Sequence, residues 1–583
     1  MTSGDAIRPA SRVLLSLAAV AIAFAAADTY VVVLALPDMM SSTGLPITEL
    51  QRAAPIVSGF LLGYVGILPL IGRISDLRGR VPVLLASLVV FAVGSLITAA
   101  AYNLESIVVG RLIQGIGGGG LIPPTLALIA DMWPPKKRGL PLGIVGAVQE
   151  LGSVLGPLYG AVVLAFGDWR AIFWLNCGIG LLLAAAMMRH RDPASSSSSL
   201  TPKDVGRPDV AGIGLAALGL LALTLVMLEP TRLVEGVTSG LAFLPVTGDS
   251  RWLTPLALAT YAVLALFLVR QATARRPLIG WRGWPALARE TDIWGALLLT
   301  AGLGAVIVTF ASAEPESGAV SPNAPWLVPL AVAAFAGFAV RQRRAAQPLI
   351  PRGALRARPA WGALVVSFFI GAALIAALVD IPFFARLTIY RDSQLDAALV
   401  LVRFLIALPI GAVLGGWLLR RVPASVLTGV AMLMSSAAFW HMSTWDATSL
   451  KHPTETFSLI VGGLGFGLAI APVNAALLAH TADAVHGVTS ALLIVARMVG
   501  MLLGISALTT IGLRTFYAAT DKIPPAAQLC GGDSTACRAY KDAVRDAGIS
   551  QLHAVFVGAA VCALIAAVLS VMLLREPQEH AAR

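Results

Sequence analysis

Charged residues are scarce in this sequence. Only 13% of its 583 residues are Asp, Glu, Lys or Arg, about half the share of an average soluble domain, which excludes an ordinary water-soluble fold. Cysteine occurs four times, too rarely for a disulfide scaffold. The phosphate-binding pattern Gly-x-x-x-x-Gly-Lys-Ser/Thr is missing, so ATP is not the expected energy source. No nucleophile lies in a recognisable arrangement with a general base, and we predict neither an enzyme nor a cofactor or metal site.

Long apolar stretches dominate instead. Hydrophobic residues make up 57% of the chain, and its mean hydropathy is +0.82. A helix needs ~20 apolar residues to cross a bilayer, and helices satisfy their own backbone hydrogen bonds there. The sequence therefore predicts an all-α polytopic membrane protein with sixteen spans, or fourteen as the alternative. The stretches lie near 12–37, 51–72, 81–101, 106–131, 139–165, 171–188, 210–228, 253–270, 293–311, 326–341, 361–386, 395–419, 424–444, 456–480, 487–513 and 551–574.

Polar breaks divide these spans into three parts. The run 195–199 is a flexible serine connector. We therefore expect a six-helix bundle over residues 1–190, a linker with two membrane hairpins over 191–358, and a second six-helix bundle over 359–583. An extended external loop, 514–550, is expected before the last span, and a loop of this length is usually functional or disordered.

The two linker hairpins look duplicated. Three short segments of the first hairpin recur in the same order in the second, although chance similarity between apolar helices is the alternative. The pairs are Asp209-Val-Ala-Gly212 with Asp292-Ile-Trp-Gly295, Trp252-Leu-Thr-Pro255 with Trp326-Leu-Val-Pro329, and Pro277-Leu-Ile with Pro348-Leu-Ile.

Basic residues explain the net charge of +11. They gather in segments 73–80, 136–138 and 341–358, which lie on one side of the membrane if the spans alternate. Cytoplasmic loops of membrane proteins carry such an excess of Lys and Arg. We therefore expect both termini to be cytoplasmic, and we expect no nucleic-acid partner.

The segment Gly72-Arg-Ile-Ser-Asp76-Leu-Arg78-Gly79-Arg80 joins the second and third spans. Its glycines permit a tight turn, and Asp76 can accept hydrogen bonds from helix N-terminal amides or from a neighbouring arginine. The segment resembles the loop signature of the major facilitator superfamily. That resemblance implies two six-helix repeats around a central substrate path and gives Asp76, Arg78 and Arg80 a role in conformational gating.

Arg111-Leu-Ile-Gln114-Gly115-Ile-Gly117 resembles a second motif of this superfamily. An arginine within a span normally faces a polar interior or a partner, although a snorkelling position near the interface is the alternative. Trp169-Arg170-Ala-Ile-Phe173-Trp-Leu-Asn176 resembles the fourteen-helix drug:proton antiporter branch.

The span 139–165 carries the strongest indication of export. Its small residues permit close helix packing and its proline can bend the helix. The pattern resembles the antiporter signature, with Ala161 in place of the usual final glycine, whereas a generic glycine-rich interface does not predict this spacing. The matching residues are Gly143, Gly152, Gly156, Pro157 and Gly160.

A tighter resemblance is to the mycobacterial triacylglyceride exporters that work with a periplasmic lipoprotein. It implies an inner-membrane monomer that exchanges protons for a lipid or another hydrophobic compound. A multidrug:proton antiporter is the alternative, and a non-transporting scaffold for a lipoprotein is an alternative of another class. The matching segments are Asp28-Thr-Tyr-Val-Val-Val, Gln149-Glu150-Leu-Gly-Ser-Val-Leu-Gly-Pro157-Leu-Tyr-Gly160, Leu405-Ile-Ala-Leu-Pro-Ile-Gly-Ala412, His486-Gly487 and Ala496-Arg497-Met498.

Charges inside the spans are functional candidates, because burying them is costly. Asp28 lies near mid-span and could load and release a proton, or form a fixed ion pair. Glu150 and Arg497 lie at a similar depth of ~15–17 Å in opposing bundles, and the family resemblance also points to this pair. Pairing of each within its own bundle is the alternative. Asp380, at a position that echoes Asp28, and Arg403 are secondary candidates.

The remaining candidates lie in the external loop. Cys530 and Cys537 bracket Gly-Gly-Asp-Ser-Thr-Ala, and a disulfide between them is plausible in an oxidising compartment. We expect the charged run 538–547 to continue the last span outward as an amphipathic helix. Together these elements could form a platform for departing lipid or for a lipoprotein acceptor.

Overall fold

The protein is described here by a computed structural model that covers residues 9–45, 50–190, 209–274, 278, 284–311, 323–390, 393–524 and 538–575. Within these ranges every regular element is helical. Sixteen helices there are long and apolar enough to cross a membrane, which confirms the expected fold class and the larger of the two expected numbers of spans.

One span of the N-terminal bundle is made of two helices. Residues Leu104–Met132 form a single candidate span, as expected, but the helix is interrupted at Gly120 and Leu121, where α4 ends and α5 begins. Pro123 and Pro124 follow at once, and prolines cannot donate the hydrogen bonds that would continue α4. The helices are α1 (Pro9–Ser42), α2 (Leu50–Arg78), α3 (Arg80–Ala99), α4 (Leu104–Gly119), α5 (Ile122–Met132), α6 (Gly139–Phe166) and α7 (Trp169–Arg189).

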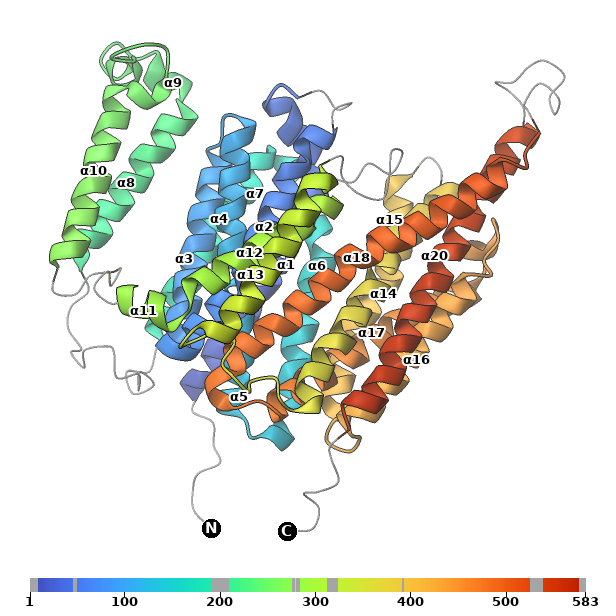
Figure 1. Cartoon of the computed structure of the whole chain (residues 1–583). Coiled ribbons are helices and arrows are strands. Elements are labelled where there is room, and N and C mark those ends of the chain that lie inside the picture. Colours follow the sequence, from blue (N-terminus) through green and yellow to red (C-terminus); the bar gives the residue numbers. More distant parts are fainter. Residues whose placement is uncertain are drawn as a thin grey trace, which may run out of the picture.

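The linker folds into two helical hairpins, α8–α10 and α12–α13. Figure 1 shows α8–α10 at the outer edge of the molecule, whereas α12–α13 lies against the bundles. The helices are α8 (Val210–Leu228), α9 (Thr231–Val234), α10 (Pro255–Thr273), α11 (Trp284–Glu290), α12 (Ile293–Ala311) and α13 (Ala324–Arg344).

Equivalent contacts occur inside the two hairpins. Asp209 pairs with Arg270 in the first hairpin, and Asp292 pairs with Arg341 in the second. The hydrogen bond from Arg270 lowers the pKa of Asp209. When these ion pairs are aligned, Gly219 corresponds to Gly302 and Leu264 corresponds to Phe335. Gly219 packs on Leu264, and Gly302 packs on Phe335.

One of the three sequence matches lies out of this register. The two tryptophan–proline segments are offset by three residues from the matched arginines. Accordingly, Pro255 is the first residue of α10, whereas Pro329 lies inside α13.

Helices enter the expected loop 514–550 from both sides. α20 begins at Arg538, which confirms the expected outward helix over 538–547, whereas α18 continues to Thr520, beyond the expected end of its span at 513. Cys530 and Cys537 lie outside the described residues. The helices of the C-terminal bundle are α14 (Arg358–Thr388), α15 (Gln394–Leu418), α16 (Ala424–Met442), α17 (Pro453–Ala479), α18 (His486–Thr520) and α20 (Arg538–Leu573).

Short 3-10 turns occur in all three parts of the chain. They are η2 (Pro135–Lys137), η4 (Gly240–Phe243), η5 (Arg251–Leu253), η7 (Ser449–Lys451) and η8 (Asp483–Val485).

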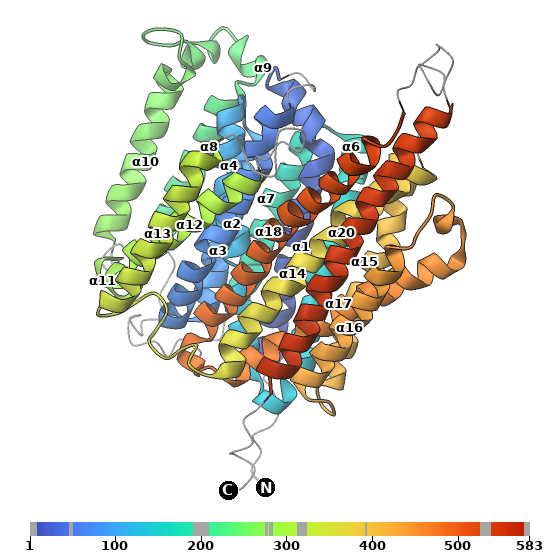
Figure 2. The same ribbon diagram turned by 45° about the vertical axis from the view of Figure 1, so that its right-hand side comes forward.

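Two seams join the bundles. At one seam α2 packs against α18, and at the other α6 packs against α15. We call the end of the molecule where α1 begins and α20 finishes the proximal end, and the opposite end the distal end. Figures 1 and 2 show α18 and α20 running together beyond the rest of their bundle at the distal end.

Candidate functional site

Asp28 lies in a buried ion pair inside the N-terminal bundle. Its Oδ2 atom accepts a hydrogen bond from Arg111 Nη1 at 2.6 Å, between α1 and α4. Arg111 exposes only 1% of its surface, so the alternative of a snorkelling arginine is excluded. Its guanidinium lies 4.2 Å from the centre of the Phe60 ring, which adds a cation–π contact.

Amides complete this cluster. Gln114 and Asn176 both donate to Asp28 Oδ1, Gln114 at 3.1 Å. Gln114 also accepts from Arg111 Nη1 at 2.7 Å and donates to Ser95 Oγ at 2.9 Å. Three helices, α1, α4 and α7, therefore meet on one carboxylate whose oxygens are both bonded, and Ser95 links α3 to the cluster through Gln114.

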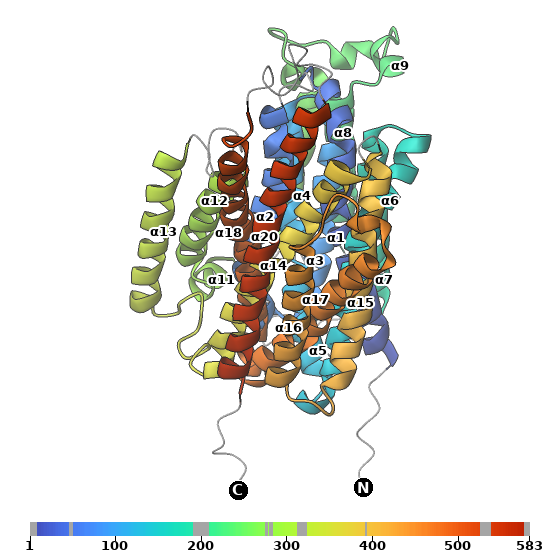
Figure 3. The ribbon, with the colours of Figure 1, turned by 90° about the vertical axis from the view of Figure 1, so that its right-hand side faces the viewer.

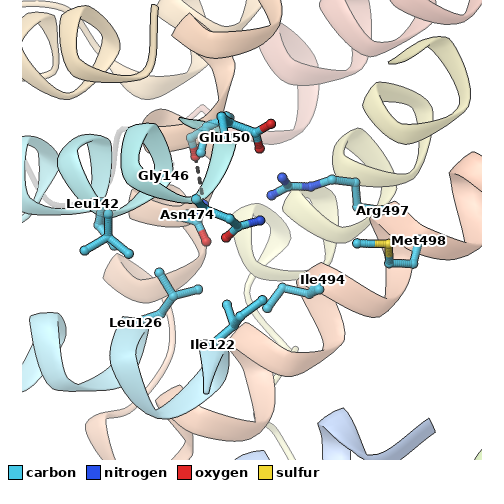
Figure 4. A pocket seen from close by; sticks show the side chains of 12 residues that line it. Ile122, Leu126, Leu142, Gly146, Glu150, Asn474, Ile494, Arg497 and Met498 are labelled. Atoms are coloured by element: carbon cyan, nitrogen blue, oxygen red, sulfur yellow. Dashed lines mark hydrogen bonds between the residues drawn. The ribbon is translucent and has the colours of Figure 1, made fainter. Parts of the chain in front are cut away.

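Glu150 and Arg497 face each other from opposite bundles. Glu150 belongs to α6 and Arg497 to α18, and Figure 4 shows their charged groups pointing toward one another across a pocket. The two charges interact electrostatically. Arg497 Nε is buried and has no hydrogen-bond partner within the described ranges. Neither side chain forms an ion pair with a described residue of its own bundle, as the alternative would require.

The pocket between them is largely apolar. Its walls come from α5 and α6 of one bundle and from α17 and α18 of the other, and the amides of Gln149 and Asn474 add polar groups. Such a lining suits a hydrophobic ligand held beside a small number of polar groups. The lining residues are Ile122, Leu126, Leu142, Val145, Gly146, Gln149, Glu150, Ile470, Asn474, Ile494, Arg497 and Met498.

Asp76 holds the bundles together at the proximal end. Its oxygens accept hydrogen bonds from the backbone N–H groups of Gly487 (2.8 Å) and Val488 (3.0 Å), at the start of α18. Arg80 bonds to Asp76, lies 3.2 Å from Asp131 Oδ2, and donates to the carbonyl of Asp483. Both partners expected for Asp76, a helix N-terminus and a neighbouring arginine, are present.

Of the two glycines expected to permit a tight turn, Gly79 does so, whereas Gly72 lies inside α2 and contacts α18. Gly79 has a φ of 91°, a left-handed conformation that side chains disfavour, and it lets α3 begin two residues after α2 ends. A Cβ atom on Gly72 would lie 2.5 Å from the carbonyl oxygen of Gly487, so only glycine permits this contact. Arg78 is half-buried at the end of α2.

Arg138 adds a second closure at the proximal end. Its guanidinium donates to the carbonyls of Ala130 (2.8 Å) and Leu478 (3.4 Å), which belong to different bundles. Burial lowers the pKa of this guanidinium, and the nearby carboxylates of Asp483 and Asp131 oppose that effect.

The glycines of α6 face two different partners. Cβ atoms on Gly152 and Gly156 would lie 2.1 and 2.5 Å from the carbonyl oxygens of Ala23 and Ala27, so these glycines bring α6 against α1 within one bundle. Gly143 instead approaches Ala412 of α15 across the seam. The helix continues through Pro157, and Gly160 is buried.

The secondary charges are separate from both clusters. Arg403 of α15 donates to Thr456 Oγ1 at 2.9 Å and is half-buried. Asp380 of α14 is also half-buried, and among the described residues it has no hydrogen-bond or ion-pair partner. The expected echo of Asp28 by Asp380 therefore does not extend to its surroundings.

Sequence reasoning assigned no role to several residues that complete these sites. Gln114 and Asn176 were named only as parts of motifs. Neither Asn474 nor Arg138 was predicted to be a site residue. Gln114 could have been found, because it follows Arg111 by three residues and so lies on the same helix face. No group of three or more His, Cys, Asp or Glu that could hold a metal occurs in the described part of the chain.

Comparison with known proteins agrees with this architecture. Residues 18–341 match the Major Facilitator Superfamily. A human organic anion transporter, MFSD10, and the proton:xylose symporter XylE share the fold, each with a TM-score of 0.53 and 13% identity. The alignments cover 97% of this chain and 100% and 96% of those chains.

Relatives with higher identity are named triacylglyceride transporters. The chain is 35% identical to one from Mycolicibacterium hassiacum (87% of this chain, 81% of that protein) and 33% identical to one from Mycolicibacterium smegmatis (97% and 88%). A probable triacylglyceride transporter of Mycobacterium leprae is 34% identical, with 98% of both chains covered. The chain is therefore a multi-pass membrane transporter, not an enzyme, and it belongs to the Major Facilitator Superfamily.

Proposed function

We propose that this transporter exports a triacylglyceride-like lipid across the bacterial inner membrane, driven by proton entry. The observation that carries the proposal is the pair Glu150 and Arg497, which face each other from opposite bundles across a largely apolar pocket. The names of the mycobacterial relatives supply the substrate class.

Proton coupling follows from the position of this pair. When the bundles approach, Arg497 stabilises the ionised carboxylate of Glu150. When they separate, the carboxylate loses that partner in an apolar pocket, where the protonated form is favoured. Binding or release of a proton therefore biases the distance between the bundles, which is the movement that alternating access requires.

The conformation fits an outward-facing state. Asp76 and Arg138 close the proximal end. That end carries the basic segments 73–80 and 136–138, and the excess of basic residues supports its assignment to the cytoplasm. Both termini would then be cytoplasmic, and the distal end would face outward.

Asp28 has a different role in this proposal. Because Arg111, Gln114 and Asn176 occupy its oxygens, a proton can reach this carboxylate only in a conformation that loosens the cluster. We propose that it couples protonation to the packing of α1, α4 and α7.

The distal extensions suit transfer of lipid out of the membrane. α18 has 35 residues and α20 has 36, so each is ~52–54 Å long, against ~30 Å for the hydrocarbon core. The α20 extension is charged, with Arg545 paired to Asp542 and Asp546. We propose that the pair carries lipid away from the bilayer or contacts a lipoprotein acceptor.

Reconstitution tests the main proposal. Purified protein in liposomes with a pH gradient should move a fluorescent triacylglyceride, and the variant Glu150→Gln should not. Glu105→Gln, at an exposed carboxylate in the first turn of α4, is the matched control and should retain activity. Lipid movement that continues without a pH gradient, or in Glu150→Gln, would contradict the coupling. Preferred transport of an amphipathic drug would favour the multidrug alternative.

Deleting residues 514–544 tests the extensions, because it removes about two turns from each helix. Lipid transfer to an acceptor protein or vesicle should fall, while the remaining bundle should keep its thermal stability. Full transfer by the shortened protein would contradict a role for the extensions.

A further inference from the structure

The two seams between the bundles are closed alike at the proximal end. Gly72 lies against Gly487 at the α2–α18 seam, and Gly416 lies against Gly139 at the α6–α15 seam. Neither contact leaves room for a side chain, since a Cβ atom on Gly72 or Gly416 would lie within 2.5 Å of the facing carbonyl oxygen. At these two contacts the seams are equivalent.

Further from this end, α12 covers the α2–α18 seam. It packs against both helices, and Leu299, Leu303 and Ile307 share one hydrophobic cluster with Ile494 and Val495 of α18. Figure 3 shows the α12–α13 hairpin on one side of the molecule and α6 with α15 on the other. Hydrophobic side chains of the linker therefore stand between this seam and the surrounding bilayer.

A polar contact and two glycines fix α12 in place. Thr300 Oγ1 donates a 2.7 Å hydrogen bond to the carbonyl oxygen of Gly66 in α2. A Cβ atom on Gly66 would lie 2.7 Å from Thr300 Cγ2, and one on Gly304 would lie 2.7 Å from Leu62 Cδ1. Close approach at small residues is a common basis of helix association in membranes.

The first hairpin provides an internal comparison. In the register of the matched glycines, Ala217 takes the place of Thr300 and Leu221 takes the place of Gly304. Leu221 is 58% exposed. The residues that fix α12 to α2 are thus specific to the second hairpin, although both hairpins share the same internal contacts.

Among the described residues, no linker helix covers the α6–α15 seam in the way that α12 covers the other seam. Between Ile56 and Arg78, every residue of α2 is buried or half-buried, whereas α6 has exposed residues along most of its length. Ala161 lies five helical turns after Gly143, on the same face, yet Ala161 is exposed. The face of α6 that meets α15 at the proximal end is therefore uncovered toward the distal end.

We propose that lipid passes between the bilayer and the central pocket by the α6–α15 seam, and that α12 acts as a fixed seal on the α2–α18 seam. This route rests on the proposed lipid transport. Acyl chains can move along the uncovered apolar face of α6, which also carries Glu150, without entering water. α12 remains with the N-terminal bundle and lets α18 slide past it.

Two engineered proteins test the route, with the native cysteines replaced by serine. In the first, Leu62→Cys and Gly304→Cys are oxidised to join α12 to α2. In the second, Ala161→Trp and Ala165→Trp narrow the α6–α15 seam, and Leu218→Trp with Leu221→Trp in α8 is the matched control. The readout is the initial rate at which a pyrene-labelled triacylglyceride leaves proteoliposomes under a pH gradient.

The oxidised disulfide protein should transport as fast as its reduced form. The tryptophans in α6 should slow transport about tenfold, equivalent to about 1.4 kcal/mol in the barrier, with unchanged thermal stability, and those in α8 should not. Loss of transport on oxidation would show that α12 must move and would overturn the seal. A full rate with the α6 tryptophans would overturn the route. Failure of the unsubstituted protein to move lipid would instead overturn the proposed function.

Discussion

The two bundles stabilise their interiors in different ways. The N-terminal bundle holds a charged cluster, in which Asp28 and Arg111 are buried together with two amides. The C-terminal bundle holds a continuous group of aromatic rings, with neighbouring centroids 5.3–6.5 Å apart. Its rings belong to Phe384, Phe404, Phe439, Trp445, Phe466 and Phe556.

This contrast indicates which bundle responds to a proton directly. Aromatic packing does not depend on charge, whereas a buried ion pair fails when one partner is neutralised. The C-terminal bundle has intramembrane charges too, but Arg497 is directed at the other bundle. We infer that protonation alters packing inside the N-terminal bundle, and that it acts on the C-terminal bundle through Glu150 and Arg497.

The largest expected effect concerns the pair between the bundles. Glu150→Arg and Arg497→Glu should each abolish lipid transport, because two like charges would then face each other across an apolar pocket. The double variant should recover part of the activity, since it restores opposite charges. Rates of lipid transport in proteoliposomes measure both the loss in the single variants and the recovery in the double variant. A double variant as inactive as either single one would argue against direct coupling.

The next effect compares the two aspartates that echo each other. Asp28→Asn should destabilise the protein by about 3–5 kcal/mol, because it leaves Arg111 buried without a charged partner. Asp380→Asn, the matched change in the other bundle, should stay within about 1 kcal/mol. Thermal unfolding in detergent measures both. Equal stability losses would remove the contrast between the bundles.

A smaller effect is expected for the closure at the proximal end. Asp76→Asn weakens charge-assisted hydrogen bonds to the start of α18, each worth about 1.5–3 kcal/mol. The proximal end should open more often, seen as longer distances between spin labels at Lys136 and Arg420. Glu105→Gln, which changes an exposed carboxylate outside this closure, is the control. An unchanged distance distribution in Asp76→Asn would show that the remaining contacts suffice.

The smallest effect tests the linker. Thr300→Val removes one hydrogen bond at nearly constant volume and should cost about 0.5–1.5 kcal/mol. Thermal unfolding should register this loss, whereas Ala217→Val in the first hairpin should leave stability unchanged. If the two variants are equally stable, the Thr300 bond does not fix α12 to α2.

Local features of the chain could be predicted from the sequence because their causes are local. Apolar length determined the candidate spans, and a glycine in a tight turn determined the break between α2 and α3. The expected outward helix over 538–547 is confirmed, because this charged run forms the start of α20. The change of helix within the expected span 106–131 was not predicted, although Pro123 and Pro124, which interrupt the hydrogen bonds of α4, are visible in the sequence.

The pairing of the buried charges could not be read from the sequence and emerged from the packing of the helices. The sequence placed Asp28, Glu150 and Arg497 in one functional set, but the structure separates Asp28, with Arg111, from the pair between the bundles. The partner of a buried charge depends on the rotation of each helix about its axis and on the order of helices around a bundle. Both are set by contacts between distant segments, such as Gly152 against Ala23. For the same reason, two hairpins with equivalent internal contacts differ in position, because Thr300 and Gly304 contact α2 and their counterparts in α8 do not.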